Sequence, residues 1–142
     1  MTASDELVLD ASLTLAWALP DEASPYGDAI LKRVVAGKAW VPDLWPHEVA
    51  NALIMAERRK RISAAQRSLF VEELLKLPIA VVDGSPRAIL ETQAALADRY
   101  TLTAYDAAYL DLALRKGLPL ATQDKPLSMA AAKAGVKLAK TR

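Results

Sequence analysis

The chain has 142 residues, which is enough for one domain with a hydrophobic core that needs no covalent cross-links. It contains no cysteine and a single histidine, which excludes a disulfide framework, a thiolate zinc site and a multi-histidine metal site within one chain. The net charge of +1 neither favours nor opposes a polyanionic partner, so the functional prediction depends on where the charged residues lie.

The N-terminal segment MTASDELVLD is acidic and lacks the basic residues and long apolar run of a signal peptide. No window approaches the roughly 20 apolar residues that a membrane-spanning helix needs. We therefore expect residues 1–142 to form a single domain that does not contact a membrane and resides in the cytoplasm. Any bound metal must be held mainly by oxygen, which favours Mg²⁺ or Mn²⁺.

The first half of the chain predicts two strands and four helices. A buried strand over Glu6–Asp10 ends on an acid, and helices over 13–19 and 26–36 are separated by the breaker segment PDEASP. A strand over Lys38–Pro42 follows. The next helix starts from residue 43, tolerates Pro46 in its first turn and ends in the basic run 58–61. Ser63 caps a further helix that reaches residue 77.

The second half continues the alternation of strands and helices. A strand over Ile79–Asp83 precedes a helix over 86–99, and a helix capped by Thr103 ends at Gly117. A strand over Leu118–Thr122, a helix over 127–134 and a weak strand over 136–139 complete the chain. Apolar strands that alternate with helices indicate a parallel sheet covered on both faces. We predict a three-layer α/β/α fold with about five strands.

Four acids stand at the expected ends of strands or starts of helices: Asp10, Glu48, Asp106 and Asp124. Each has an ordinary structural explanation, because carboxylates cap helices and favour their first turn. The predicted sheet, however, brings all four toward one cleft, where they repel one another unless a cation lies between them. Hydroxyl or amide groups in reach of this cleft belong to Ser12, Asn51 and Thr122.

The segments VLDASLTLAWALPDE, VPDLWPHEVANAL and LTAYDAAYLDLALRKGLPLATQDKPL together resemble PIN-domain ribonucleases, specifically the VapC-type toxins of toxin–antitoxin pairs. The match runs in order over nearly the whole chain. The resemblance implies that Asp10, Glu48, Asp106 and Asp124 are the catalytic residues and bind Mg²⁺ or Mn²⁺, with supporting hydroxyls on Ser12 and Thr122. It also implies an endoribonuclease that hydrolyses RNA phosphodiesters and leaves a 5′-phosphate.

Further expectations concern partners. Backbone contacts to RNA would come from basic side chains, namely Arg58, Arg59, Lys60, Arg61, Arg115, Lys116 and Lys125. A cluster of carboxylates attracts Arg or Lys, so we expect a cognate VapB-type antitoxin whose tail lies in the acidic cleft. A homodimer is expected because the apolar helical content of Leu13–Trp17 and Leu69–Leu77 exceeds what a small sheet can cover.

Two alternatives remain open from the sequence. A receiver-like phosphoacceptor domain would use Asp83 and Lys125, but its acidic pair after the first strand is replaced here by DAS. A PIN-like domain that binds RNA without cleaving it would keep the fold and lose turnover. Asp83 and Asp111 lie outside the matched set of acids, and we interpret Asp83 as a turn residue and Asp111 as a solvated or salt-bridged side chain.

Overall fold

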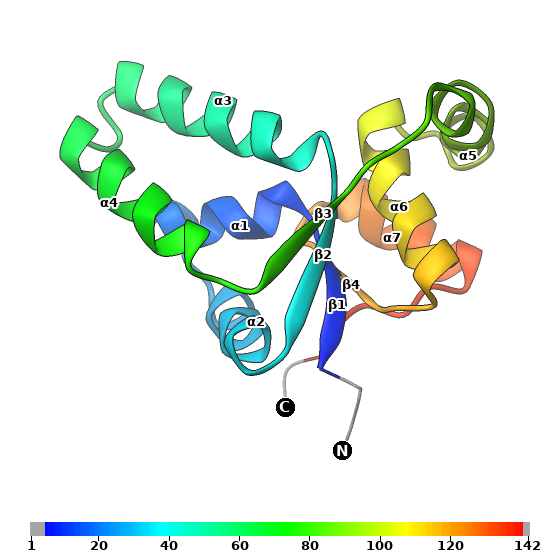
Figure 1. The fold of residues 1–142 in the computed structure, drawn as a ribbon, viewed down its shortest axis with the longest axis horizontal. Helices are drawn as coiled ribbons and strands as arrows, with labels where there is room; N and C mark the ends of the chain where they lie inside the picture. The colour runs from blue at the N-terminus through cyan, green and yellow to red at the C-terminus, as the bar shows by residue number, and fades with distance from the viewer. Residues whose placement is uncertain (1–4, 141–142) are drawn as a thin grey trace.

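The computed structural model describes residues 5–140 and contains a four-stranded parallel sheet in the order β3-β2-β1-β4 (Figure 1). Residues 1–4 of the acidic N-terminal segment and residues 141–142 lie outside the described residues, so the two ends of the predicted domain are not described. The strands are β1 (Glu6–Leu9), β2 (Lys38–Pro42), β3 (Ile79–Val82) and β4 (Leu120–Ala121). The predicted parallel sheet is confirmed.

Helices cover both faces of this sheet, so the predicted three-layer architecture is also confirmed. Figure 1 shows α1 to α4 on one side of the strands and α5 to α7 on the other. Their bounds are α1 (Ala11–Ala18), α2 (Pro25–Ala36), α3 (Trp45–Arg58), α4 (Ala64–Leu75), α5 (Ala94–Tyr100), α6 (Ala104–Lys116) and α7 (Lys125–Ala134).

The core lies against β1, which is central in the sheet. Leu7, Val8 and Leu9 are fully buried, because α2 packs on one face of β1 and β2 while α6 packs on the other. This double coverage explains why the strand is apolar at every position rather than at alternate ones. Among the described residues, no helix is both long and apolar enough to span a bilayer.

Three boundaries differ from the sequence prediction. The fifth strand is reduced to a single parallel bridge between Leu120 and Leu138, because β4 offers only two residues for pairing. The helix expected over 86–99 opens with a π-helical segment, η2 (Ala88–Gln93), before α5 begins. A 3₁₀ turn, η1 (Pro20–Glu22), occupies part of the predicted breaker between α1 and α2.

Local capping chemistry agrees with the sequence. Ser63 and Gln66 form a reciprocal capping box at the start of α4. Gly117 and Gly135 end α6 and α7 with φ of +64° and +82°, a left-handed conformation that favours glycine. Gly117 ends α6 just before β4, and Gly135 ends α7, the helix that Asp124 caps.

Candidate metal centre

The loops that follow β1 and β4 lie side by side at the carboxyl edge of the sheet. Leu9 pairs with Ala121, and the Asp10 amide donates a 3.0 Å hydrogen bond to the carbonyl of Ala121. Asp10 is the N-cap of α1, whereas Asp124 is the N-cap of α7 and accepts a 2.9 Å bond from the amide of Leu127. Two of the four predicted acids are therefore brought together by strand pairing.

Two hydroxyl groups converge on the Asp10 carboxylate. Ser12 and Thr122 each donate a 2.6 Å hydrogen bond to Oδ2 of Asp10, and their own oxygens lie 3.5 Å apart. Thr122 Oγ1 also accepts a 2.9 Å bond from the Asp124 amide. Because Asp10 is only 4% exposed, these bonds fix one carboxylate oxygen in a buried position. The sequence places both hydroxyls within reach of the predicted acidic cleft, and this geometry agrees with that expectation.

Glu48 and Asp106 approach the same edge from the first turns of α3 and α6. The hydroxyl of Tyr109, one turn after Asp106, donates a 2.5 Å hydrogen bond to Oε1 of Glu48. Tyr109 is fully buried, and it lies within α6 between the sheet and the start of α3. This hydrogen bond joins the two helices that carry the second pair of acids.

Asp106 reports the mutual proximity of all four carboxylates. Its pKa is raised to about 6, first by burial and then by the negative charges of Asp124, Asp10 and Glu48. Thr103 caps α6 by accepting a 3.1 Å bond from the Asp106 amide, and its hydroxyl opposes part of the pKa rise. Asp106 thus stands in the first turn, as a capping residue does, and also in the acidic cluster.

The pKa values of Asp10 and Glu48 are raised as well. Burial is the main cause for Asp10; the Ser12 and Thr122 hydroxyls oppose it, and the charge of Asp124 adds to it. Burial also dominates at Glu48, where the Tyr109 hydrogen bond lowers the pKa and the Asp10 charge raises it. A partly desolvated group of carboxylates with raised pKa values is poised to gain from a nearby cation.

The donor set is made of oxygen alone, which suits Mg²⁺ or Mn²⁺ better than softer metals. Within residues 5–140, however, no three His, Asp or Glu side chains are placed closely enough to ligate one ion without movement. The two observations agree, because charge coupling acts over many ångströms while ligation needs about 2.0–2.6 Å. The donor chemistry of these residues suits an oxygen-ligated cation, and ligation would require the carboxylates to approach one another.

A second layer of hydrogen bonds supports the site, and sequence reasoning missed it. Thr14 Oγ1 donates a 3.2 Å bond to the carbonyl of Asp10 and accepts a 3.0 Å bond from Trp45 Nε1. These bonds tie the start of α1 to the start of α3. The position of Tyr109 on the same face of α6 as Asp106 could have been predicted, but its contact with Glu48 could not, since 61 residues separate them.

The other predicted site residues differ in how close they lie to the four acids. Asn51 is exposed on α3, one turn after Glu48, and Lys125 directly follows Asp124 at the start of α7. Arg58 ends α3 about 15 Å along the helix axis from Glu48, from the rise per residue. The basic run of Arg58, Arg59, Lys60 and Arg61 is therefore not brought to the acids.

Three of the predicted RNA contacts have protein partners. Arg61 is ion-paired with Asp21 and Glu22 at 2.8 and 2.9 Å. Lys116 lies 3.7 Å from the centroid of the Trp40 ring, in the last turn of α6 and away from the acids at its first turn. Arg115 pairs with Asp111, whose side chain is 4% exposed; the prediction of an ion pair there is confirmed, and that of a solvated side chain is wrong.

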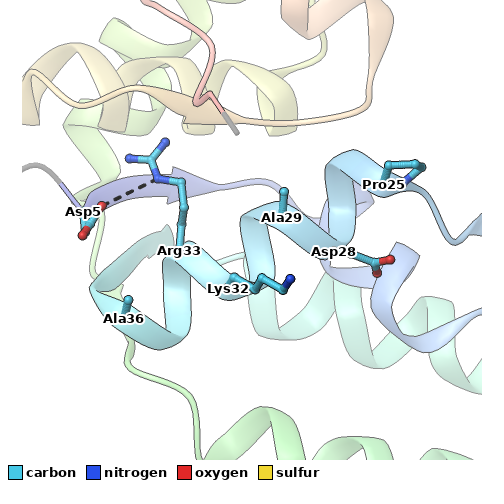
Figure 2. Close-up of a pocket in the computed structure, with 7 residues that line it drawn as sticks. All are labelled: Asp5, Pro25, Asp28, Ala29, Lys32, Arg33 and Ala36. Carbon is cyan, nitrogen blue, oxygen red and sulfur yellow. Dashed lines mark ion pairs between the residues drawn. The ribbon is translucent and has the colours of Figure 1, made fainter. Parts of the chain in front are cut away.

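A separate pocket of about 490 Å³ runs along α2 and contains none of the four acids. Figure 2 shows its residues, with the ion pair of Asp5 and Arg33 at one end and Pro25 at the other. Arg33 also donates a 2.9 Å hydrogen bond to the carbonyl of Lys140, which anchors the C-terminal segment. We assign this pocket a structural role, since its charged groups hold the chain together.

The parallel sheet order and the acidic carboxyl edge define a PIN-like nuclease fold. The PIN domain family model matches residues 7–133, so the chain belongs to the PIN domain family, as the resemblance predicted. Over 123 residues the chain is 34% identical to Ribonuclease VapC3 of Pyrobaculum aerophilum, a match that covers 87% of this chain and 92% of that protein.

Two solved structures are similar in fold. PAE2754 from Pyrobaculum aerophilum has a TM-score of 0.68 and 29% identity, and the match covers 90% of this chain and 80% of that one. FitAcB from Neisseria gonorrhoeae has a TM-score of 0.61 and 17% identity, covering 95% of this chain and 97% of that one. Family membership decides against the receiver-like alternative, and Asp83 lies exposed after the edge strand β3, two strands from β1.

Proposed function

We propose that this chain is a Mg²⁺- or Mn²⁺-dependent endoribonuclease and the toxin of a toxin–antitoxin pair, acting as one PIN domain. The similarity to a protein named Ribonuclease VapC3 supports the ribonuclease activity. One structural arrangement carries the proposal: the pairing of β1 with β4 and the first turns of α3 and α6 gather four carboxylates at one edge of the sheet, where their mutual repulsion contributes to the raised pKa of Asp106. A cation between these carboxylates would relieve that repulsion.

In this proposal Asp10, Glu48, Asp106 and Asp124 hold the cation. When bound, such an ion lowers the pKa of a coordinated water and neutralises charge on the phosphate. The protein contributes orientation. Oδ2 of Asp10 accepts bonds from Ser12 and Thr122, and Oε1 of Glu48 accepts a bond from Tyr109, so these bonds orient each carboxylate and its other oxygen would serve as the ligand.

RNA would approach through the basic residues nearest to the acids. Lys125 directly follows Asp124 at the start of α7, and Asn51 is exposed one turn after Glu48. Both can donate hydrogen bonds to phosphate oxygens or to a ligand carboxylate. Arg58, Arg59 and Lys60 would contact only a longer RNA, because they lie at the far end of α3.

The direct test of the activity is to incubate the purified protein with single-stranded RNA and identify the new ends. We expect internal cuts that leave a 5′-phosphate and a 3′-hydroxyl. RNA binding without new ends would instead support a non-catalytic PIN-like domain. In cells, mapping 5′ ends shortly after induction would then identify the RNA that is cut.

An antitoxin partner would place an Arg or Lys side chain beside the carboxylates, since the cluster carries excess negative charge. Co-expression with the product of the adjacent reading frame should give a stable complex in which RNA cleavage is suppressed. If neighbouring products neither bind nor inhibit, the regulatory half of the proposal fails while the ribonuclease half stands.

We still expect a homodimer, but of the two apolar segments that the sequence suggested, only the one on α4 now supports it. Leu13 is fully buried within the chain, so α1 needs no second copy to cover it. On α4, however, Leu69 and Leu75 are 62% and 80% exposed. These two exposed leucines are apolar surface that a second copy of the chain could cover. Light scattering at tens of micromolar, about the range where obligate dimers persist, should give twice the chain mass of 15.3 kDa.

A further inference from the structure

A cavity of about 200 Å³ lies at the carboxyl ends of β2 and β3, between the segment that leads into α3, the segment η2 and α6. Leu44 and Tyr105 line it, and they come from the same two helix starts that carry Glu48 and Asp106. Tyr105 directly precedes Asp106, so their side chains leave α6 about 100° apart at nearly the same height. The cavity and Asp106 therefore share the first turn of α6, so a ligand in the cavity contacts the same turn that carries this acid.

The chemistry of the cavity suits an aromatic ring with polar edges. Its walls are mainly apolar, with Pro42, Val82 and Ala108 among them, and it is smaller than the roughly 300 Å³ of a typical drug-sized site. A carboxylate, Asp43, also lines it, which disfavours a phosphate group inside. Tyr105 is 65% exposed, so the face of its ring is available for stacking.

Arg115 supplies a hydrogen-bond donor to this cavity and is held in place by a buried network. Its Nε donates a 3.1 Å bond to Oδ2 of Asp111, and Gln93 Nε2 donates a 3.2 Å bond to the same oxygen. Asp111 and Gln93 are 3% and 5% exposed. Among residues 5–140, these bonds engage only Nε of Arg115, so its terminal nitrogens can face a ligand.

Gln93 is the last residue of the π-helical segment η2. The wider turn of a π-helix shifts the register of the residues that follow it, and such segments are frequent at functional sites. Asp43 is also oriented, because its Oδ2 accepts a 3.1 Å bond from the amide of Gly84. The cavity thus contains an oriented acceptor, an oriented donor and an exposed aromatic ring.

We propose that this cavity binds an unpaired nucleobase of the RNA next to the cleaved phosphate, with guanine preferred. Guanine presents acceptors at O6 and N7 for Arg115 and donors at N1 and N2 for Asp43. Single-stranded RNA is read in this way, by stacking on aromatic rings and by hydrogen bonds to base edges. The inference rests on the proposed ribonuclease function, and it assigns Arg115 and Tyr105 to substrate recognition.

The test compares the parent with three variants. Each protein cleaves a pool of single-stranded RNA of randomised sequence, and the new 5′ ends of the products are sequenced. The parent should enrich guanosine at one position beside the cut. Arg115→Lys retains a charge for Asp111 but loses the planar fork, and Tyr105→Leu retains an apolar side chain but loses the ring. Both should lose that enrichment, with kcat/KM for guanosine-containing RNA about ten-fold lower. Arg87→Lys, at an exposed pair with Glu91, is the matched control.

A binding measurement separates the two possible failures. In EDTA, fluorescence anisotropy of labelled RNA tetramers should show tighter binding when one base is guanine, and Arg115→Lys should abolish the difference. A parent that discriminates guanine without cleaving RNA would support the subsite and refute the nuclease. A parent that cleaves with no base preference, or variants that keep the preference, would overturn the subsite. Equal binding of all tetramers would overturn it as well.

Discussion

The hydroxyl of Tyr109 donates a 2.5 Å hydrogen bond to Oε1 of Glu48, and it does so from a fully buried ring. Through this bond α6, which carries Asp106, orients the acid of α3. The same bond opposes the pKa rise that burial causes at Glu48, since it stabilises the ionised carboxylate. Tyr109 is therefore a positioning residue for the candidate metal centre.

Tyr109→Phe removes this hydroxyl and keeps the ring in the core. We expect a stability loss of about 1 kcal/mol, because one hydrogen bond to a charged group is lost. Metal affinity and RNA cleavage should fall by about 10- to 100-fold, as is usual when a residue that orients a ligand is removed. Tyr100→Phe on α5 is the control, and Mn²⁺ titration followed by thermal unfolding measures the effect.

Asp106→Asn distinguishes capping from metal binding. If Asp106 serves only the start of α6, the variant should lose up to about 2 kcal/mol of stability and retain activity. The charge coupling to Asp124, Asp10 and Glu48 predicts a different outcome. Stability without metal should hold or rise, Mn²⁺ should stabilise the variant less than the parent, and cleavage should fall by orders of magnitude.

The choice of control for that experiment follows from the structure. Asp111→Asn, which the sequence suggests as a neutral change, would disturb a buried ion pair with Arg115. Asp28 also lies in the first turn of a helix, is exposed and is outside the acidic cluster, so Asp28→Asn should leave cleavage and metal response unchanged. An Asp106 variant that is less stable yet cleaves RNA fully would return Asp106 to a capping role.

The pH dependence of stability should show the coupling directly. The folded-state pKa of Asp106, about 6, lies above the ordinary value of 3.8, so the folded protein binds more protons between these values. Its contribution to stability is present at low pH and is lost as the pH rises through about 6. The measurement is the unfolding temperature of the parent minus that of Asp106→Asn, both in EDTA. This difference should therefore rise as the pH is lowered from 7.5 to 5.

Because Asp106 is half-exposed, the expected size of this effect is about 1 kcal/mol, or roughly 3 °C. Saturating Mn²⁺ should reverse its direction, since the cation binds the ionised carboxylates and is displaced by protons. A difference between the two proteins that does not change with pH would show that Asp106 is not coupled to the other acids.

Thr122→Val tests the hydroxyls around Asp10. The change removes a 2.6 Å bond to Oδ2 of Asp10 and the acceptor for the Asp124 amide, while the side chain keeps its shape. We expect a stability loss of about 1–3 kcal/mol at pH 7 and a 10-fold or greater loss of metal affinity. The matched change Thr92→Val, at an exposed position in η2, should alter neither quantity.

Much of the fold and the placement of the acids could be predicted from the sequence, because both follow from local signals. Apolar strands, capping residues and terminal glycines fixed the order of elements, and the topology of a parallel sheet then gathered the acids at one edge. The predicted fifth strand is wrong, because β4 has only two residues and the segment after α7 meets it at the single bridge between Leu120 and Leu138.

What could not be predicted depends on contacts between distant residues. Gln93, the last residue of the π-helical segment η2, donates a hydrogen bond to Asp111, and neither this contact nor the π-helix is indicated by a period of the sequence. Trp45 meets Thr14 across 31 residues, and Arg61 meets Asp21 across 40. The distance between the basic run 58–61 and the acids follows from the length of α3, and the prediction that this run contacts RNA stays a prediction.

The metal dependence of RNA cleavage tests the central claim most directly. The rate of cleavage of single-stranded RNA is measured with Mg²⁺, with Mn²⁺, in EDTA, and after Mn²⁺ is added back in excess, for the parent and for Asp10→Asn. We predict cleavage by the parent in either metal, loss of cleavage in EDTA, recovery on adding back Mn²⁺, and no cleavage by the variant under any condition. Cleavage by the parent that persists in EDTA, or a variant as active as the parent, would contradict the proposed four-carboxylate metal centre.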